Sequence, residues 1–456
     1  MKKFLENINN IWKIEELRNR ILFTLLILAV YRFGSFVVLP GVNPQALEAA
    51  SQGGGQGLLG LINIFTGGAF NKGAIFALGI MPYITASIII QLLGFAVPYF
   101  QRLQQKEGES GRKKITQITR LLTVFITLVQ GSGYLAWIKM NGGISPHISE
   151  TIFWFSNIVI LSTGTIFAMW LGEKITDKGI GNGISLLIMI GIIASLPSAF
   201  VAEFTAKTIG AGGLLAFIIE MAVFFLVVIA TILIVQGVRR IPIQFAKRMV
   251  GRSSADLPAS GARDYIPLKV NAAGVMPIIF AQAIMFLPAT IAQFFNEEAV
   301  ANSSFLTQMN DWKSWTYNIV FFLLVVIFTY VYTALLVNPQ QYAEYLKRQN
   351  SFIPGIKPGS QTQDYIDTLT TRITLPGSIF LGLISILPAF IARFGVNDAF
   401  ALFFGGTSLL ILVGVVLDTL QQIESYLLMR KYDTLTRSGK LAGRGSGGMQ
   451  QIGASF

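Results

Sequence analysis

Residues 213–235 read GLLAFIIEMAVFFLVVIATILIV, an apolar run in which Glu220 is the only charged side chain. A helix of about 20 apolar residues spans the hydrocarbon core of a bilayer at roughly 1.5 Å per residue. The run therefore predicts a membrane-spanning helix, and nine further apolar stretches along the chain have a similar character. The ten predicted spans lie at residues 21–38, 74–93, 117–137, 152–172, 181–197, 213–235, 271–292, 316–337, 373–392 and 399–417.

The composition agrees with an all-α protein that crosses a membrane many times. Of the 456 residues, 53% are hydrophobic and only 13% are charged, and the mean hydropathy is +0.60. Soluble domains contain about 25% charged residues, so a soluble enzyme, a disordered chain or a coiled coil fits poorly. The chain has no cysteine and a single histidine, His147. This excludes a disulfide framework, a thiolate nucleophile and a Cys-based metal site.

Basic residues are distributed unevenly between the two sets of connecting segments. One set carries 29 of the 35 Lys and Arg residues and a net charge of about +14, against about −1 for the alternate loops. An excess of basic residues marks the cytoplasmic face, so we expect both termini in the cytoplasm. The basic segments are residues 1–20, 94–120, 173–180, 236–270, 338–372 and 418–456.

The connection at residues 198–212 divides the spans into two sets of five, in halves that we place at 21–205 and 206–431. An odd number of spans gives the two halves opposite topologies, the arrangement of inverted repeats. No repeat is visible in the sequence itself, so this division is geometric. We interpret the Gly- and Ser-rich residues 432–456 as a flexible cytoplasmic tail.

Residues 1–20 begin like a signal peptide but carry three acidic residues, Glu6, Glu15 and Glu16. We therefore interpret the segment as uncleaved. Its apolar residues recur at helical spacing, which suggests a cytoplasmic amphipathic helix on the membrane surface. These residues are Leu5, Ile8, Trp12 and Leu17.

Few ionisable residues lie inside the predicted spans. Glu220 and Arg32 are each near the outer end of a span, so we expect both side chains to reach the interface. Ion-coupled transporters place such groups at the bilayer midplane, and intramembrane proteases need paired catalytic groups. The run GIGNG at 179–183 follows no strand and is therefore no dinucleotide-binding loop. We expect no catalytic residue, no metal site and no cofactor.

Residues 58–73, LLGLINIFTGGAFNKG, form a short segment that is apolar at first and then broken by Gly67, Gly68 and Gly73. The segment is too short to span a bilayer, and its unpaired backbone groups require protein or water around them. A re-entrant half-helix on the outer side satisfies this requirement. The alternative is a disordered outer loop, which the Gly-rich run 53–57 favours.

Two further patterns are weak when each is taken alone. Ile80 and Ile84, like Ile184 and Ile188, lie one helical turn apart, although such pairs usually face lipid or pack against a neighbouring helix. The loops at 236–270 and 338–372 are basic and rich in turn residues. The run IPGIKPG at 353–359 predicts a stiff turn that presents Lys357 at its tip. Such a surface suits a partner with phosphates or acidic groups, although the charges also set the topology.

Several motifs together resemble the SecY/Sec61-alpha family of protein-translocation channels, from about residue 18 to about residue 430. Their order along the chain makes the resemblance far more specific than any single motif. They are FALGIMPYITASIIIQLL at 76–93, GESGRKK at 108–114, MWLGEKITDKGIGNGIS at 169–185, RRIPIQFAKR at 239–248, LKVNAAGVMP at 268–277, IPGIKPG at 353–359 and FGGTSLLI at 404–411.

The resemblance implies an hourglass pore between the two five-helix halves, narrowed by a ring of apolar side chains and closed on the outer side by a plug. An apolar constriction resists ion leakage because it dewets when empty. The ring would consist of Ile80, Ile84, Ile184, Ile188, Ile279 and Ile411, and the plug of Asn63, Ile64, Phe65, Thr66, Gly67 and Gly68.

The resemblance also implies a lateral gate toward lipid, between the second and third spans on one side and the seventh and eighth on the other. Polar residues matching the family's gate positions are Thr85, Gln130 and Asn271. Taken singly, each of these could equally bond its own helix backbone. The family's docking surface for the SecA motor ATPase and for ribosomal RNA falls on Arg239, Arg240, Lys247, Arg248, Arg252 and Lys357.

One residue departs from the family pattern. The family commonly has Arg where this chain has Lys357, and lysine keeps the charge but loses the planar five-donor fork. A bidentate contact at this position is therefore not expected, whereas a contact through charge is retained.

The sequence thus predicts a channel in the cytoplasmic membrane that exports unfolded, signal-bearing polypeptides and releases membrane segments into lipid. The main alternative is an inverted-repeat secondary transporter of a small solute, followed by a membrane enzyme or a scaffold. A partner ATPase, the ribosome or the proton gradient would supply the energy. Partners that the resemblance implies are SecE, SecG, SecA, the ribosome, signal peptides, secretory chains and membrane lipids, with SecDF and YidC as accessory proteins.

Overall fold

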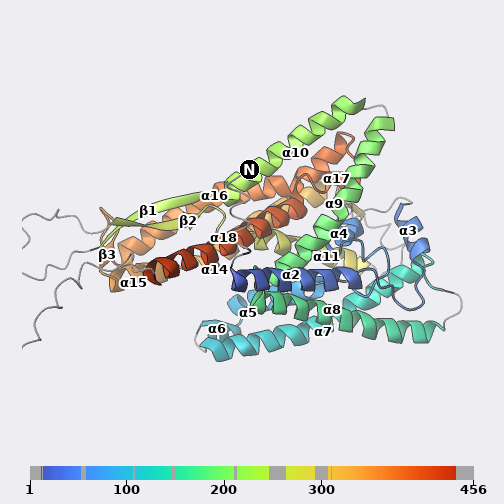
Figure 1. The fold of residues 1–456 in the computed structure, drawn as a ribbon, viewed down its shortest axis with the longest axis horizontal. Helices are drawn as coiled ribbons and strands as arrows, with labels where there is room; N and C mark the ends of the chain where they lie inside the picture. Colours follow the sequence, from blue (N-terminus) through green and yellow to red (C-terminus); the bar gives the residue numbers. More distant parts are fainter. Residues whose placement is uncertain are drawn as a thin grey trace, which may run out of the picture.

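The computed structural model describes residues 12, 14–52, 58–105, 108–145, 149–209, 213–245, 263–292, 307–309 and 311–437. Nearly all of this structure is helical (Figure 1). The sequence-predicted amphipathic residues Leu5 and Ile8 lie outside the described residues, as does most of the predicted tail.

The N-terminal half contains eight helices, of which five are long. The short helices α3, α4 and α6 lie between them. The helices are α2 (Glu15–Gly34), α3 (Pro44–Gln52), α4 (Leu58–Phe65), α5 (Met81–Ala96), α6 (Pro98–Gln105), α7 (Gly108–Met140), α8 (Glu150–Lys178) and α9 (Gly183–Ile209).

The C-terminal half adds further helices and a small sheet. Its elements are α10 (Gly213–Val235), β1 (Val238–Phe245), β2 (Arg263–Lys269), α11 (Met276–Ala292), α14 (Trp315–Leu336), α15 (Pro339–Arg348), β3 (Ser351–Phe352), α16 (Ser360–Arg393), α17 (Asp398–Ala401) and α18 (Gly406–Arg437).

Ten helices correspond to the ten predicted spans, which confirms the predicted fold class. Seven of them are long and apolar enough to cross a membrane within the described residues, and α5 and α11 contain shorter apolar helices. The tenth, α2, begins at Glu15 and includes Leu17, which is buried. The helix therefore starts inside the segment 1–20 that the sequence assigned to a separate surface helix.

Several predicted boundaries were wrong. Residues 75–80 form turns before α5, and Gly79 among them adopts a positive φ of 53°. The tenth predicted span is divided by a turn at Gly406, which has a φ of 61°. The predicted outer connection at 198–212 is mostly helical, since α9 continues through Pro197 to Ile209. Helix α18 likewise extends past residue 431.

Apolar side chains cover the outside of the helices as well as the core. The span window of α10 is only 6% buried, and its residues Leu215, Leu226 and Leu233 are each at least 66% exposed. A helix with so much exposed apolar surface fits a lipid environment. Helices of both halves share one large apolar cluster, and α7 packs with part of α8 in a second cluster.

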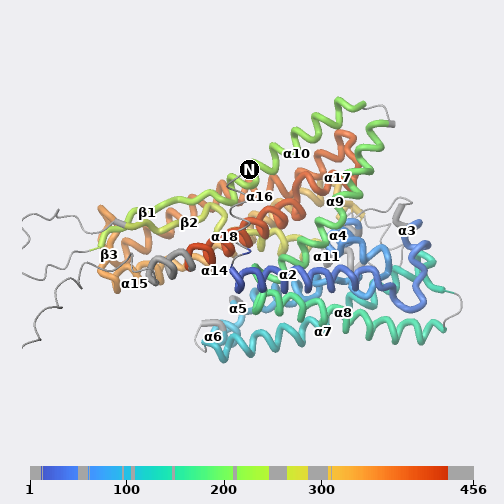
Figure 2. Tube along the Cα trace, in the orientation of Figure 1, coloured from blue at the N-terminus to red at the C-terminus, as the bar shows by residue number. Residues whose placement is uncertain are grey.

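The two halves meet along α9. This helix contacts α10 and α18 of the C-terminal half, and on another side α5 contacts α11. Figure 2 shows the blue-to-green trace of the first half beside the green-to-red trace of the second, with α9 between them.

The basic loops contain a three-stranded antiparallel sheet that the sequence prediction missed. Its strand order is β2-β1-β3, with Arg240 opposite Pro267 and Gln244 opposite Phe352. The sheet lies at the opposite end of the bundle from α3 (Figure 1). It has its own small core, formed by Ile241, Ile243, Leu268, Leu346, Ile353 and Ile366.

Candidate functional site

The six predicted ring isoleucines, here called the isoleucine ring, all belong to the large apolar cluster. Ile80, Ile84, Ile188 and Ile411 are buried, with between 2% and 7% of their surface exposed. Ile184 and Ile279 are partly buried and pack against the same cluster. The structure therefore brings together residues that are more than 300 positions apart in the sequence.

Each ring residue lies at the start of its helix. Ile80 is the N-cap residue of α5, with Ile84 in the first turn of that helix. Ile184 and Ile188 occupy the first two turns of α9. Ile279 lies in the first turn of α11, and Ile411 in the second turn of α18. Four helix beginnings from both halves thus contribute isoleucines to one apolar cluster.

A cavity of about 260 Å³ adjoins part of the predicted ring. Three ring residues line it, namely Ile188, Ile279 and Ile411. Its other walls carry polar or charged side chains and include the end of β2, so the cavity lies on the side of the bundle that holds the sheet. These residues include Asn182, Ser185, Lys269, Asn271, Asp418 and Thr419.

The predicted plug segment, residues 58–73, begins with the short helix α4 and ends in turns. Ile64, Phe65 and Thr66 are buried, and α4 packs against α9. Gly67 and Gly68 adopt φ values of 64° and 89°, which reverse the chain at little steric cost. The segment lies within protein, as the re-entrant interpretation requires, and is not a disordered outer loop.

The hydrogen bonds of the plug segment are mostly internal. The Thr66 hydroxyl donates to the carbonyl oxygens of Ile62 and Asn63 at 3.1 and 3.2 Å. The side-chain oxygen of Asn63 accepts from the backbone N–H of Asn71 at 3.1 Å. These bonds help the segment to hold its own local shape.

Arg32 makes a contact that the sequence did not predict. Its Nη1 donates to the carbonyl oxygen of Gly67 at 2.6 Å, so the guanidinium group of α2 contacts the plug segment. The only signal in the sequence is that Arg32 is the one basic residue within the first predicted span.

Glu220 also has a partner that the sequence did not predict. Its carboxylate pairs with Lys207 Nζ at 2.7 Å, and the same ammonium lies 3.7 Å from Glu203, which is fully buried. We call Glu203, Lys207 and Glu220 the outer ion cluster. The backbone N–H of Asn397 donates to Glu203 at 2.8 Å, and Lys207 donates to the carbonyl oxygen of Gly395 at 3.0 Å. The cluster therefore connects α9 to α10 and to the turn before α17.

The three predicted gate residues are not hydrogen-bonded to one another in the described part of the chain. Thr85 donates to the carbonyl oxygen of Met81 in its own helix at 3.0 Å. Asn271 is buried beside the cavity, and its Oδ1 has no hydrogen-bond partner among the described residues. Gln130 is half-buried on α7. Their role in a gate stays a prediction.

Three of the six predicted docking residues are described, and all three are exposed. Arg239 and Arg240 lie on the exposed part of β1, next to the buried Ile241. Lys357 lies at an exposed turn between Gly355 and Gly359, whose φ values are 85° and 112°. The Lys357 carbonyl oxygen accepts from the Thr362 hydroxyl at 2.9 Å, which joins the turn to α16. The remaining three, Lys247, Arg248 and Arg252, lie outside the described residues.

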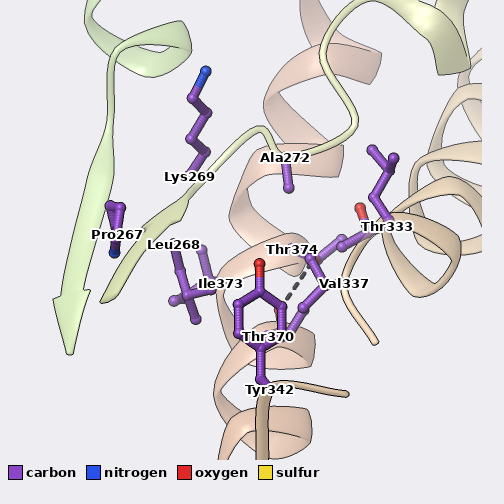
Figure 3. Close-up of a pocket in the computed structure, with 11 residues that line it drawn as sticks. Pro267, Leu268, Lys269, Ala272, Thr333, Val337, Tyr342, Thr370, Ile373 and Thr374 are labelled. Carbon is purple, nitrogen blue, oxygen red and sulfur yellow. Dashed lines mark hydrogen bonds between the residues drawn. The ribbon is translucent and has the colours of Figure 1, made fainter. Parts of the chain in front are cut away.

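A second cavity of about 240 Å³ lies between β2, α14, α15 and α16. Figure 3 shows the Tyr342 hydroxyl directed into it and the Lys269 ammonium directed away. Its wall includes the hydrogen bond from Thr374 to the Thr370 carbonyl oxygen at 2.8 Å. Lys269 and Ala272 line both cavities, so the segment from β2 to α11 separates them.

Comparisons with a family model and with individual proteins identify the same family. The family model SecY matches residues 74–420. The protein translocase subunit SecY of Streptomyces galbus is 44% identical over 452 residues, which cover 93% of this chain and 98% of that protein.

Solved structures give the same fold at lower identity. A SecY structure described for its plug domain, which stabilises the closed state of that translocation channel, matches with a TM-score of 0.61 at 18% identity. Sec61 in the canine ribosome-channel complex matches with a TM-score of 0.57 at 17% identity. Each match covers 90% of this chain and 92% of the other chain. The chain belongs to the SecY family of protein translocase subunits.

Proposed function

We propose that this chain is the protein-conducting channel of a Sec translocon. It moves unfolded polypeptides that carry a signal sequence across the membrane and releases transmembrane segments sideways into lipid. The observation that carries this proposal is that four helices of both halves contribute the six isoleucines to one apolar cluster, which also includes the short docked segment and borders a cavity with some polar side chains. A solute transporter would instead need polar binding groups at this level.

The chemistry of the ring suits an unfolded polypeptide as cargo. Isoleucine side chains form no hydrogen bonds, so they hold no residue type in the moving chain. The empty constriction excludes water and therefore ions. Branched side chains in contact with the cargo can limit leakage during transport.

The plug segment is a second barrier on the side of the ring away from the cavity. Ile64 and Phe65 of this segment and the ring belong to the same apolar cluster. When cargo enters, the segment would have to leave this position. Its internal hydrogen bonds favour movement as one unit.

Release into lipid would occur between α5 and α7 on one side and α11 and α14 on the other. Contact between α5 and α11 supports a closed arrangement on this side of the bundle. A membrane segment gains roughly 0.3–0.6 kcal/mol for each Leu or Ile that it places at the bilayer centre. Hydrogen bonds between membrane helices average only about 0.6 kcal/mol, so bonds formed by Thr85, Gln130 or Asn271 would yield to such a segment.

The energy for transport would come from partners at the cytoplasmic face. We place the sheet, Lys357 and both termini in the cytoplasm. They belong to the segments with an excess of Lys and Arg, and such an excess marks the cytoplasmic side of a membrane protein. Arg239, Arg240 and Lys357 offer exposed charge to ribosomal RNA or to the SecA ATPase. SecE and SecG would complete the complex in the cytoplasmic membrane.

Disulfide cross-linking tests the path of the cargo. The chain contains no cysteine, so single cysteines can replace Ile80, Ile184, Ile279 or Ile411. Controls carry a cysteine at Leu215 or Leu226, which are exposed on α10. A secretory protein with one cysteine is stalled during export. Cross-links at the ring and none at α10 are expected, whereas efficient export without ring cross-links would place the path elsewhere.

A further inference from the structure

The only direct contact between a charged side chain and the backbone of the plug segment, among the described residues, involves Arg32. Its guanidinium Nη1 donates to the Gly67 carbonyl oxygen at 2.6 Å. A hydrogen bond with an ionised donor is shorter and stronger than one between neutral groups. The bond joins α2 to the turn that ends the re-entrant helix, across 35 residues of sequence.

Aromatic contacts hold the guanidinium group in this position. Arg32 lies over the ring of Phe36 at 4.9 Å from its centre, and Lys72 lies over the same ring at 4.4 Å. Lys72 belongs to the end of the plug segment. The Phe36 ring is therefore shared by one cation from α2 and one from the segment that α2 contacts.

Gly67 allows no side chain at the point of contact. A Cβ there would lie 2.5 Å from Arg32 Nη1 and 3.0 Å from the Cα of Gly191 on α9, and its φ is 64°. The backbone of the plug segment thus fits between a guanidinium group on one side and a helix backbone on the other. The fit is specific for a glycine facing an extended cation.

We propose that Arg32 is a positioning residue that latches the plug segment in the closed channel. The proposal rests on the proposed function, since it assumes that the segment closes a pore. Withdrawal of the segment breaks the bond to Gly67 and leaves the guanidinium group on Phe36. The latch therefore sets how readily the idle channel opens, without contributing to the path that cargo follows.

Arginine is suited to this role because its five donors lie in one plane, so one nitrogen can bond the carbonyl while the plane stacks on an aromatic ring. A lysine would keep the charge but could not make both contacts in this geometry. Glutamine would keep one donor group and lose the charge.

The test compares Arg32→Gln and Arg32→Lys with Arg20→Gln in the complete translocon. Arg20 lies in the same helix but pairs with an exposed residue, Glu16, at 3.2 Å. Two quantities are measured: the ion conductance of the idle channel in a planar bilayer, and the export of a precursor whose signal sequence is defective. Neither would rise if Arg32 served only to stabilise the fold.

Loss of a charge-assisted hydrogen bond is expected to raise the open fraction roughly 10- to 100-fold. Arg32→Gln should show this rise in conductance and export the defective precursor, with Arg32→Lys between it and the wild type. Equal conductance in Arg32→Lys and Arg20→Gln would overturn the proposal that Arg32 holds the plug segment. If Arg32→Gln does not accumulate in the membrane, the comparison of Arg32→Lys with Arg20→Gln alone tests the proposal. Failure of the channel function is recognised separately, because the wild type would then give no ring cross-links.

Discussion

Gly191 on α9 lies directly against the backbone of the plug segment, because a Cβ at Gly191 would be 2.2 Å from the carbonyl oxygen of Phe65. Real Cβ atoms do not approach an oxygen this closely, so one of the two backbones has to move if a side chain is added. Gly191 follows Ile188 of the isoleucine ring by three residues on the same helix. The docking of the plug segment and the position of the ring are therefore coupled through α9.

Replacing Gly191 with alanine should displace the plug segment. Overpacking of this kind costs about 1–3 kcal/mol, so the undocked fraction should rise roughly tenfold. The expected result is a higher ion conductance of the idle channel, measured in planar bilayers, with export of normal precursors retained. Gly131→Ala is the matched control, because a Cβ there meets only side-chain atoms of Leu161 and Leu78 at 3.8 Å. Similar conductance in the two variants would show that Gly191 does not hold the segment.

A polar side chain in the ring should admit water to the constriction. Ile411 is 2% exposed and belongs to the large apolar cluster, so Ile411→Asn places an amide among buried apolar side chains. We expect a marked rise in idle ion conductance because the constriction no longer dewets. Ile411→Leu keeps the volume and polarity, costs less than about 1.5 kcal/mol and should stay closed. If the asparagine variant conducts no more than the leucine variant, the seal does not depend on this position.

The sequence predicts the spans most accurately where a helix faces lipid on most sides. The run 213–235 coincides with α10, Gly213–Val235, because that helix is apolar along nearly its whole length and only Phe217 and Thr231 of it are buried. Hydropathy fails where apolar residues form turns, as at 75–80 and around Gly406, since φ values do not appear in composition. The sheet did leave a signal, since buried Ile241 and Ile243 alternate with exposed Pro242.

For the sites as well, features that depend on neighbouring residues could be predicted from the sequence, whereas contacts between residues far apart in the sequence could not. Each isoleucine pair is visible as a helical repeat, and the family resemblance assigned it to a ring that the packing of four helices brings together. The contact of Arg32 with Gly67 depends on how the plug segment folds back, so neither residue alone predicts it. Likewise, Glu203 and Asn397 are 194 residues apart and meet only in the folded chain.

Removing the central cation of the outer ion cluster should destabilise the fold. Lys207→Met leaves the carboxylates of Glu203 and Glu220 close together and without a cation, and Glu203 is fully buried. Loss of one partner from a buried ion pair costs roughly 3–5 kcal/mol of unfolding free energy. Adding Glu220→Gln removes one of the two charges and should recover part of this loss.

Thermal unfolding of the purified protein in detergent measures the effect. Lys313→Met is the matched control, since Lys313 also contacts a carboxylate, Asp398, at 2.7 Å. Both side chains of that pair are more than a third exposed, so the control should lose at most about 1 kcal/mol. If Lys207→Met lowers the free energy of unfolding by as little as the control does, the outer ion cluster stabilises the fold no more than a surface ion pair.

Reversing the charge of Lys357 should impair coupling to a cytoplasmic partner without unfolding the channel. Lys357 is exposed in a turn that Gly355, Gly359 and the bond from Thr362 hold in place, so a new side chain disturbs no packing. Lys357→Glu should reduce ATP-driven export in reconstituted vesicles, roughly tenfold if one desolvated charge contact worth about 1–2 kcal/mol is lost. Lys357→Arg keeps the charge and should export at least as well as the wild type.

Lys347→Glu separates this effect from a general change in surface charge. Lys347 is equally exposed and lies on α15, beside the same sheet, but outside the stiff turn. If the partner only senses net charge, the two glutamate variants should export alike, and higher salt should weaken both to the same extent. If the turn presents Lys357 to a complementary surface of the partner, only Lys357→Glu should slow export. A rigid turn holds its charge at one point, whereas the partner can avoid a charge on the side of a helix.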